Sequence, residues 1–162
     1  MKVSTLLNKA SEARCDEDAM TLSDILEDEF FRAKALNEYS AGNSDRCFGS
    51  DSVVDISFEI NNLLSDEYAI CAKVNVIHGD ENSYELQVRV STVRFLDKRG
   101  MGSQNYEYDE ESEDKYIADE NDSIAKFAGQ IRNLMIRQHA SLIQSVGVSS
   151  YKLAYQVAKK CL

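Results

Sequence analysis

The 162-residue chain contains no proline, only two histidines, and four widely spaced cysteines. Without proline, the loops lack the residue that most firmly fixes the backbone φ angle. The cysteines form no CxxC pair, and such spacing is typical of reduced thiols rather than of a disulfide framework or a zinc site. The four cysteines are Cys15, Cys47, Cys71 and Cys161. We therefore expect a protein without a structural metal, in a reducing compartment.

Long apolar runs are also missing. A membrane-spanning helix needs about 20 mostly apolar residues, and the chain has no such run. Residues 1–20 carry a short apolar patch but lack the apolar core and cleavage site of a signal peptide. We expect no membrane insertion and a cytoplasmic location.

Basic residues are in the minority, because 18 Lys and Arg stand against 28 Asp and Glu, for a formal net charge of -10. Nonspecific nucleic-acid binding depends on clustered Lys and Arg that neutralise phosphates. We therefore expect no nucleic-acid partner. An acidic surface either keeps a protein soluble or attracts a basic partner, and of these two roles we favour solubility.

The residue types of common catalytic sites are sparse. His78 and His139 occur in no local motif with Ser, Cys or Asp, whereas a catalytic histidine needs an orienting partner and a nucleophile. We interpret both as surface or interface histidines. Residues 42–50 contain glycines without the phosphate-binding lysine pattern, and residues 108–122 lack the glycine of a calcium loop. We expect no enzymatic activity, no cofactor and no metal.

The N-terminal part of the chain is predicted to be helical over residues 1–28. Residues 29–43 fit two patterns, since Phe30 and Leu36 share a helical face whereas Phe31 and Tyr39 share a strand face. Periodicity alone leaves this choice open. Residues 40–52 are rich in turn formers and are predicted to form a loop.

The middle of the chain alternates apolar and polar residues, which is typical of half-buried strands. One such strand covers residues 52–61. A hairpin follows over residues 67–96, with its turn at residues 78–83. Residues 98–121 are acidic, begin with glycines, and are predicted to form a mobile loop.

Apolar residues recur every three or four positions over residues 122–147, which predicts a long amphipathic helix. Asp122 or Ser123 is expected to cap its start, and Gly147 to end it. A short helix follows and is expected to bury Leu153, Ala154, Val157 and Ala158. The predicted fold is α+β: a four-stranded antiparallel meander sheet with a long and a short C-terminal helix on one face. Residues 29–162 would form this single domain, after an N-terminal helical extension over 1–28.

The order of these elements resembles the SecB family of export chaperones. The resemblance rests on the strand "DISFEIN", the hairpin "DEYAICAKVNVIHGDENSYELQVRVSTVRFL", and the long helix "SIAKFAGQIRNLMIRQHAS" with a short helix after it. It covers Phe30 to Leu162. The stretch "FFRAKALNEYSAGN" would then be the family's first strand, and "SDRCFGSDS" would replace its crossover connection.

The resemblance implies an ATP-independent holdase that binds unfolded or nascent polypeptide in apolar grooves beside the sheet. It also implies a homo-oligomer, a dimer or a tetramer, with the long helices at the interface. For the groove walls we single out Phe48, Phe58, Leu63, Leu64, Tyr151 and Tyr155. For the interface we single out Gln130, Asn133 and Arg137.

Two other interpretations stay open. Nine acidic residues with the single Lys115 lie between Glu107 and Asp122. They suit a small inhibitor or immunity protein that blocks a basic partner, such as a nuclease, through residues 107–122. The third interpretation is an assembly protein whose sheet edge pairs with its own copies.

Overall fold

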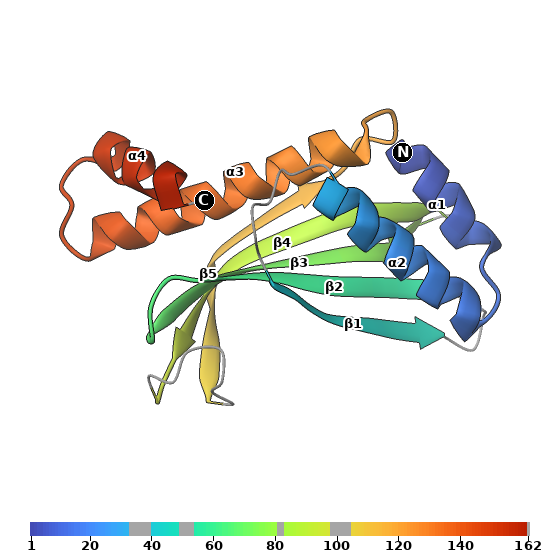
Figure 1. Cartoon of the computed structure of the whole chain (residues 1–162), viewed down its shortest axis with the longest axis horizontal. Coiled ribbons are helices and arrows are strands. Elements are labelled where there is room, and N and C mark those ends of the chain that lie inside the picture. Colours follow the sequence, from blue (N-terminus) through green and yellow to red (C-terminus); the bar gives the residue numbers. More distant parts are fainter. Residues whose placement is uncertain (33–39, 49–53, 81–82, 98–104, 162) are drawn as a thin grey trace.

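The computed structural model describes residues 1–32, 40–48, 54–80, 83–97 and 105–161. Figure 1 shows the N-terminal helices, the sheet and the C-terminal helices. In chain order the elements are α1 (Val3–Glu12), α2 (Asp16–Arg32), β1 (Ser40–Phe48), β2 (Val54–Leu63), β3 (Tyr68–His78), β4 (Tyr84–Phe95), β5 (Tyr106–Ile117), α3 (Ile124–Ser145) and α4 (Tyr151–Cys161). The five strands form one antiparallel sheet in the order β1-β2-β3-β4-β5. The predicted α+β class is confirmed.

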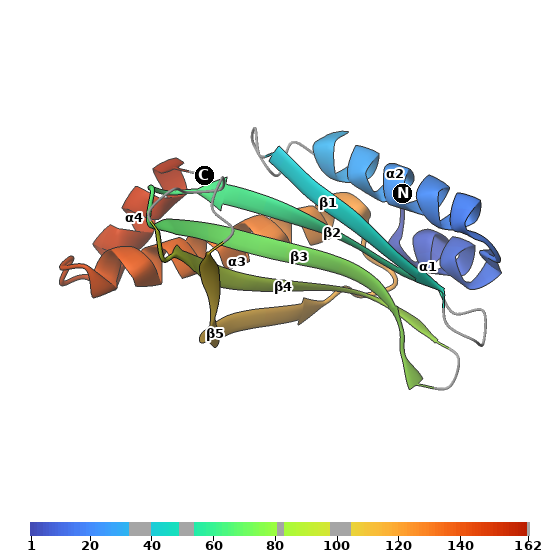
Figure 2. The same ribbon diagram turned by 90° about the horizontal axis from the view of Figure 1, so that it is seen from below.

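The helices α1, α2 and α3 cover one face of the sheet, and in the described residues no helix covers the other face, here called the open face (Figures 1 and 2). On the open face Ala69, Cys71, Val93 and Phe95 form a small buried cluster of their own. The hairpin of β3 and β4 supplies the centre of the core, as its alternation predicted. Its helix-facing side chains are fully buried, and they are Ile70, Ala72, Val74 and Val76 on β3 with Leu86, Val88 and Val90 on β4.

An aromatic group joins α2, α3 and β5. The ring of Phe127 on α3 lies 5.8 Å from that of Phe30 on α2 and 6.0 Å from that of Tyr116 on β5. The backbone also links the N-terminal part to the start of α3, because the Val3 N–H donates to the Asp122 carbonyl over 2.9 Å. The N-terminal helices therefore share one core with the sheet and α3.

The caps of α3 are those predicted from the sequence. The Ser123 hydroxyl accepts a hydrogen bond from the Lys126 N–H over 3.1 Å, which satisfies one free donor of the first turn. After the helix, Gly147 has a φ of 125°, in the region where a side chain would be strained.

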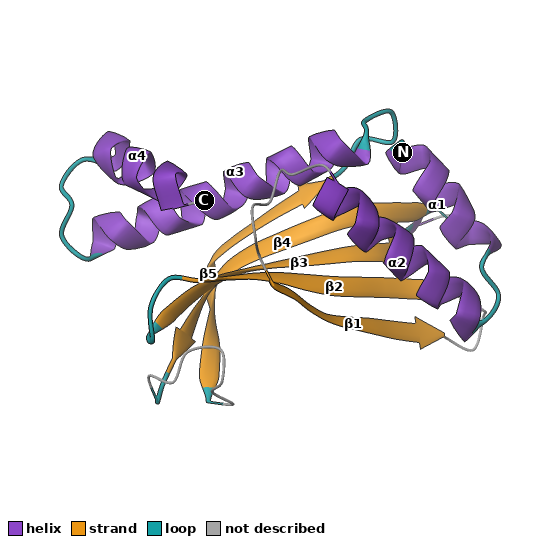
Figure 3. Ribbon diagram, in the orientation of Figure 1, coloured by secondary structure: helices purple, strands orange, loops and turns teal. Residues whose placement is uncertain are grey.

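The burial predicted for α4 is only half right. Ala154 and Ala158 are buried, but Leu153 is 57% exposed and Val157 is 42% exposed. The reason is the position of α4, which packs against α3 and not on the sheet (Figure 3). The small alanines face α3, and the larger apolar side chains are left beside that contact.

The loop predicted over residues 98–121 is wrong for Tyr106–Ile117, which form β5. Residues 98–104 lie outside the described residues. Because β5 is an edge strand, its backbone pairs with β4 while most of its charged side chains remain exposed. The acidic composition therefore concealed a strand, and the sheet has five strands instead of the predicted four.

The ambiguous stretch near residue 30 divides between a helix and a strand. The helix α2 extends to Arg32, past the predicted limit at residue 28, and residues 33–39 lie outside the described residues. The loop predicted over residues 40–52 is wrong for Ser40–Phe48, which form β1. The turn formers Gly42 and Asn43 fall where the register with β2 shifts, as is typical of a bulge.

Candidate functional site

The pairing of β4 with β5 is interrupted near its middle. Val90 pairs with Asp114, but Thr92 pairs with Asp109, so the intervening residues of β5 form a bulge. Bulges bend strands and increase their twist. Past this point the end of β4 and the start of β5 turn away from α3 (Figure 1).

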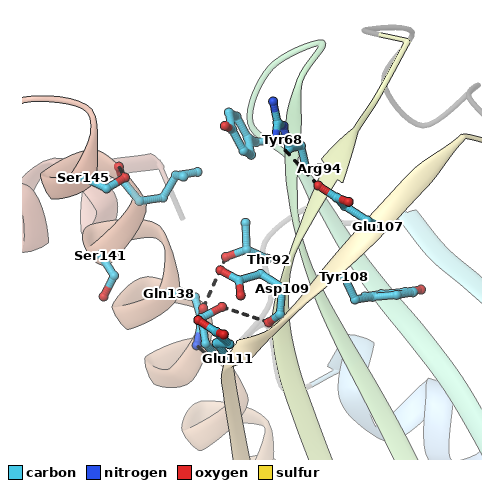
Figure 4. A pocket seen from close by; sticks show the side chains of 12 residues that line it. Tyr68, Thr92, Arg94, Glu107, Tyr108, Asp109, Glu111, Gln138, Ser141 and Ser145 are labelled. Atoms are coloured by element: carbon cyan, nitrogen blue, oxygen red, sulfur yellow. Dashed lines mark hydrogen bonds and ion pairs between the residues drawn. The ribbon is translucent and has the colours of Figure 1, made fainter.

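A cleft of about 610 Å³ opens where the strands and α3 separate (Figure 4). Its helix wall is the second half of α3, and its other wall is the bent part of β4 and β5. Twelve residues line it: Tyr68, Thr92, Arg94, Glu107, Tyr108, Asp109, Glu111, Ser112, Gln138, Ser141, Leu142 and Ser145. The volume falls within the range of about 300–1,000 Å³ that is common for ligand sites.

Gln138 fastens α3 to the sheet at the inner end of this cleft. Its side-chain oxygen accepts a hydrogen bond from the Thr92 hydroxyl over 3.3 Å. Its amide nitrogen donates to the Ser112 carbonyl and, over 3.3 Å, to a carboxylate oxygen of Asp114. Gln138 is buried, and a buried amide with its partners in place fixes the geometry around it. The network therefore sets the angle between the two walls.

Most residues of the walls are of polar types, and they carry more negative than positive charge. Glu107, Asp109 and Glu111 contribute carboxylates, and Arg94 lies 3.7 Å from Glu107. This ion pair is exposed to solvent, so it contributes little to stability. Hydroxyl, amide and carboxylate groups can bind the N–H groups of an extended chain or a basic side chain. No histidine or cysteine is among the described residues of these walls.

A second, smaller cavity of about 220 Å³ lies on the open face of the sheet. It is lined by Glu59, Cys71, Lys73, Arg89, Ser91, Tyr108 and Glu113. Burial raises the pKa of the Cys71 thiol to about 12, with a further rise from the negative charge of Glu59. The pKa of the Tyr108 hydroxyl is also raised, chiefly by burial. Both groups stay protonated at neutral pH, which leaves Cys71 a poor nucleophile.

The groove residues singled out from the sequence do not line the larger cleft where their side chains are described. Leu64 and Tyr155 pack against the main core. Tyr151 is exposed and its ring lies 6.3 Å from that of Tyr155. The side chains of Phe48, Phe58 and Leu63 lie outside the described residues, although their backbones belong to β1 and β2.

The residues singled out for an oligomer interface lie along α3. Asn133 and Arg137 are exposed, and Gln130 is half-buried. The prediction of a surface or interface position for His139 is wrong, because it is only 8% exposed, and its Nδ1 has no hydrogen-bond partner among the described residues. Burial lowers the pKa of His139. His78 lies at the end of β3 with its ring against that of Tyr84, 5.2 Å away.

Sequence reasoning missed the cleft, although one signal was present. Gln138 lies three and four residues after Met135 and Leu134, on the apolar stripe of the long helix. A polar residue at such a position either costs stability or has buried partners. That pattern could have marked Gln138, but not the bend of the strands that opens the cleft.

Within the residues that the structure describes, no group of three or more His, Cys, Asp or Glu side chains is placed to hold a metal ion. No helix in the described parts of the chain combines the length and the apolar character needed to cross a membrane. Comparisons with models of known protein families, with curated proteins and with solved structures find no significant match.

Proposed function

We propose that this protein is a non-enzymatic, ATP-independent holdase of the cytoplasm that binds unfolded or nascent polypeptide in the cleft between α3 and β5. The observation that carries the proposal is the cleft itself, which is open to solvent and bordered by an edge strand. The order of the helices and strands, which resembles the SecB family, supports the same function.

The position of the cleft along β5 suits an extended client. Consecutive residues of β5, from Glu107 to Asp109 and then Glu111 and Ser112, line it. The cleft therefore follows the strand itself rather than only one of its faces. A client in extended conformation could pair with the edge of β5, as in other cases of strand addition to a sheet.

The polar walls suit a client of no fixed sequence. Thr92, Ser141 and Ser145 carry hydroxyl groups that both donate and accept hydrogen bonds. Such groups can bind backbone N–H and C=O groups, which every unfolded chain presents. Tyr68 and Leu142 add apolar contact area. Binding of this kind would be broad and weak, and it needs no nucleotide.

A second function, inhibition of a basic partner, is favoured by the charge of β5. Six of its twelve residues are acidic, against the single Lys115. Those acidic side chains that are described lie mostly exposed. A folded basic protein, such as a nuclease, could bind this surface with high salt sensitivity.

Light scattering of aggregating clients tests the proposal. Three unrelated proteins are unfolded in urea and diluted into buffer with rising amounts of the full chain, without nucleotide. Suppression of aggregation near stoichiometric ratios with all three clients is expected. If none is protected, the holdase function is wrong, and the search turns to a single basic partner.

A matched pair of variants ties the activity to the cleft. Ser141→Trp places a large ring at the helix wall of the cleft, where Ser141 is exposed. Ala125→Trp places the same ring at an exposed site in the first turn of α3. The first variant is expected to lose client protection and the second to keep it. Equal activity of the two would place client binding elsewhere.

A further inference from the structure

Charge is divided unevenly along this chain. All 28 acidic residues lie before residue 123, whereas residues 123–162 carry six basic residues and no acidic one. The sheet and N-terminal part therefore have a formal charge of -16, from 12 basic and 28 acidic residues, and the last 40 residues have +6. The six basic residues of this last part lie on the helices α3 and α4, in a protein whose net charge is negative.

The outer surface of α4 combines this positive charge with exposed apolar side chains. Lys152, Lys159 and Lys160 are exposed. Leu153 and Val157 are exposed one turn apart, and Tyr151 is 43% exposed at the start of the helix. Apolar side chains left exposed beside lysines are typical of a surface that another molecule covers.

The strand β5 has the complementary character. Glu107, Asp109 and Glu111 are exposed along it and point toward the cleft, whereas the ring of Tyr108 points to the other side of the strand (Figure 4). The rings of Tyr106 and Tyr108 lie 5.6 Å apart and form a small aromatic platform. The exposed charges of α4 and of the cleft side of β5 are therefore opposite in sign.

We propose that α4 of one copy docks on β5 of a second copy, and that the same contact forms in reverse across a two-fold axis. The start of β5 and α4 lie toward the same end of the molecule, on the left in Figure 1. Two copies joined at that end would form the contact twice. Closed two-fold dimers are the commonest symmetric assemblies.

An anionic membrane fits the basic surface less well than a second copy does. Segments that bind anionic lipid typically carry clusters of about 4–8 Lys or Arg, whereas α4 carries three lysines, Lys152, Lys159 and Lys160. At physiological ionic strength the Debye length is about 8 Å. That distance preserves contacts between neighbouring charges and screens the repulsion between the remoter parts of two copies.

The docked helix would also complete the cleft. In a single chain most residues that line it are of polar types, whereas α4 of the partner would bring exposed Leu153 and Val157 beside β5. A wall of this kind would bind apolar side chains of a client. This consequence rests on the proposed holdase function, but the docking itself does not.

The test is a charge exchange followed by analytical ultracentrifugation. One variant, Lys152→Glu with Lys159→Glu, makes α4 acidic, and the other, Asp109→Lys with Glu111→Lys, makes β5 basic. The unaltered chain is expected to sediment as a dimer at physiological salt. Each variant alone is expected to dissociate, with a dimer dissociation constant raised about 10-fold or more.

Mixing the two variants is the decisive step. In the mixed pair both contacts join opposite charges, so one-to-one dimers are expected to return. The β5 variant also separates local docking from net charge, since its charge of -6 would by itself reduce repulsion between copies. A monomeric unaltered chain, variants that dimerise as well as it does, or masses that grow beyond the dimer would overturn the proposal.

Two further measurements keep this proposal apart from its rivals. If the unaltered chain is monomeric and sediments with vesicles of anionic phospholipid, while the α4 variant does not, α4 binds membranes and the dimer is wrong. Client protection is scored separately. Dimers without protection would uphold the docking and reject the holdase, whereas protection by a monomer would do the reverse.

Discussion

Thr92 on β4 and Gln138 on α3, 46 residues apart in the chain, are joined by a hydrogen bond of 3.3 Å at the point where the helix leaves the sheet. Before this point, Ile131, Leu134 and Met135 of α3 are buried against the core. After it, Ser141 and Ser145 are exposed and line the cleft. One polar network thus marks the boundary between the part of α3 that stabilises the fold and the part available for binding.

Removing the Gln138 amide is expected to destabilise the protein. In Gln138→Leu the Ser112 carbonyl loses its donor from α3, and the Thr92 hydroxyl loses its acceptor. Leaving buried polar groups without partners costs roughly 1–3 kcal/mol. Urea unfolding followed by circular dichroism should show this loss of unfolding free energy.

The matched control for Gln138→Leu is Ser141→Ala, because Ser141 is an exposed residue of the same helix that also lines the cleft. A change of at most about 0.5 kcal/mol is expected there. A double-mutant cycle with Thr92→Val then measures the coupling of the pair. Additive effects would show that the two side chains act independently, contrary to the network described above.

The contact between α3 and α4 is expected to tolerate no larger side chain. Ala154 is completely buried against α3, so Ala154→Leu inserts three carbon atoms into a filled interface. Such overpacking typically costs about 1–3 kcal/mol. Differential scanning calorimetry should show a lower Tm for this variant.

Gln156→Leu serves as the control for Ala154→Leu, since it adds the same side chain at an exposed position of α4. Its unfolding temperature should match that of the unaltered chain. If both leucines are tolerated equally, α4 is not held against α3 through its alanines.

The sequence predicted best those elements whose two sides differ in polarity. The hairpin of β3 and β4 alternates because one side is buried under α1 to α3, whereas the other side carries exposed polar residues such as Lys73 and Arg89, and the same pattern identified its pairing. The strands β1 and β5 are edge strands, where backbone pairing supplies the stability and side chains remain variable. The turn-forming residues of β1 and the acidic residues of β5 therefore led to the prediction of loops.

The cleft was beyond prediction for a different reason. It depends on a register shift between β4 and β5 and on the angle at which α3 leaves the sheet. Both are properties of pairs of elements, whereas periodicity describes one element at a time. The exposed Leu153 and Val157 illustrate the same limit, because they follow the apolar spacing of a helix that has one buried face, but α4 packs mainly against α3.

Acid is expected to weaken the fold through His139. Burial lowers the pKa of His139 below its ordinary value of 6.5, so the unfolded chain binds this proton more tightly than the folded chain does. The contribution of His139 to stability is therefore retained above pH 6.5 and lost as the pH falls from 6.5 toward the lower folded value. Urea unfolding at pH 7 and at pH 5.5 should differ by up to about 1 kcal/mol from this group.

His139→Gln provides the comparison for this effect, since glutamine has no titrating group. The difference in unfolding free energy between the two pH values should be smaller in the variant. An unchanged difference would mean that His139 is protonated without cost, and that it is not buried in the folded chain.

Cys71 is expected to react slowly with iodoacetamide while the protein is folded. Only the thiolate reacts, and burial, the main cause, raises the pKa of Cys71 to about 12 from an ordinary value of 9.0. At pH 8 the thiolate population is then about a hundredfold or more below that of an unperturbed thiol.

Cys15 is exposed and serves as the internal reference. Peptide mass spectrometry after timed alkylation should find Cys15 modified first, and unfolding in urea should make the two rates equal. Rapid labelling of Cys71 in the folded chain would mean that solvent reaches the thiol from the open face of the sheet. The cavity beside Tyr108 would then be a site where a small molecule can reach the Cys71 thiol.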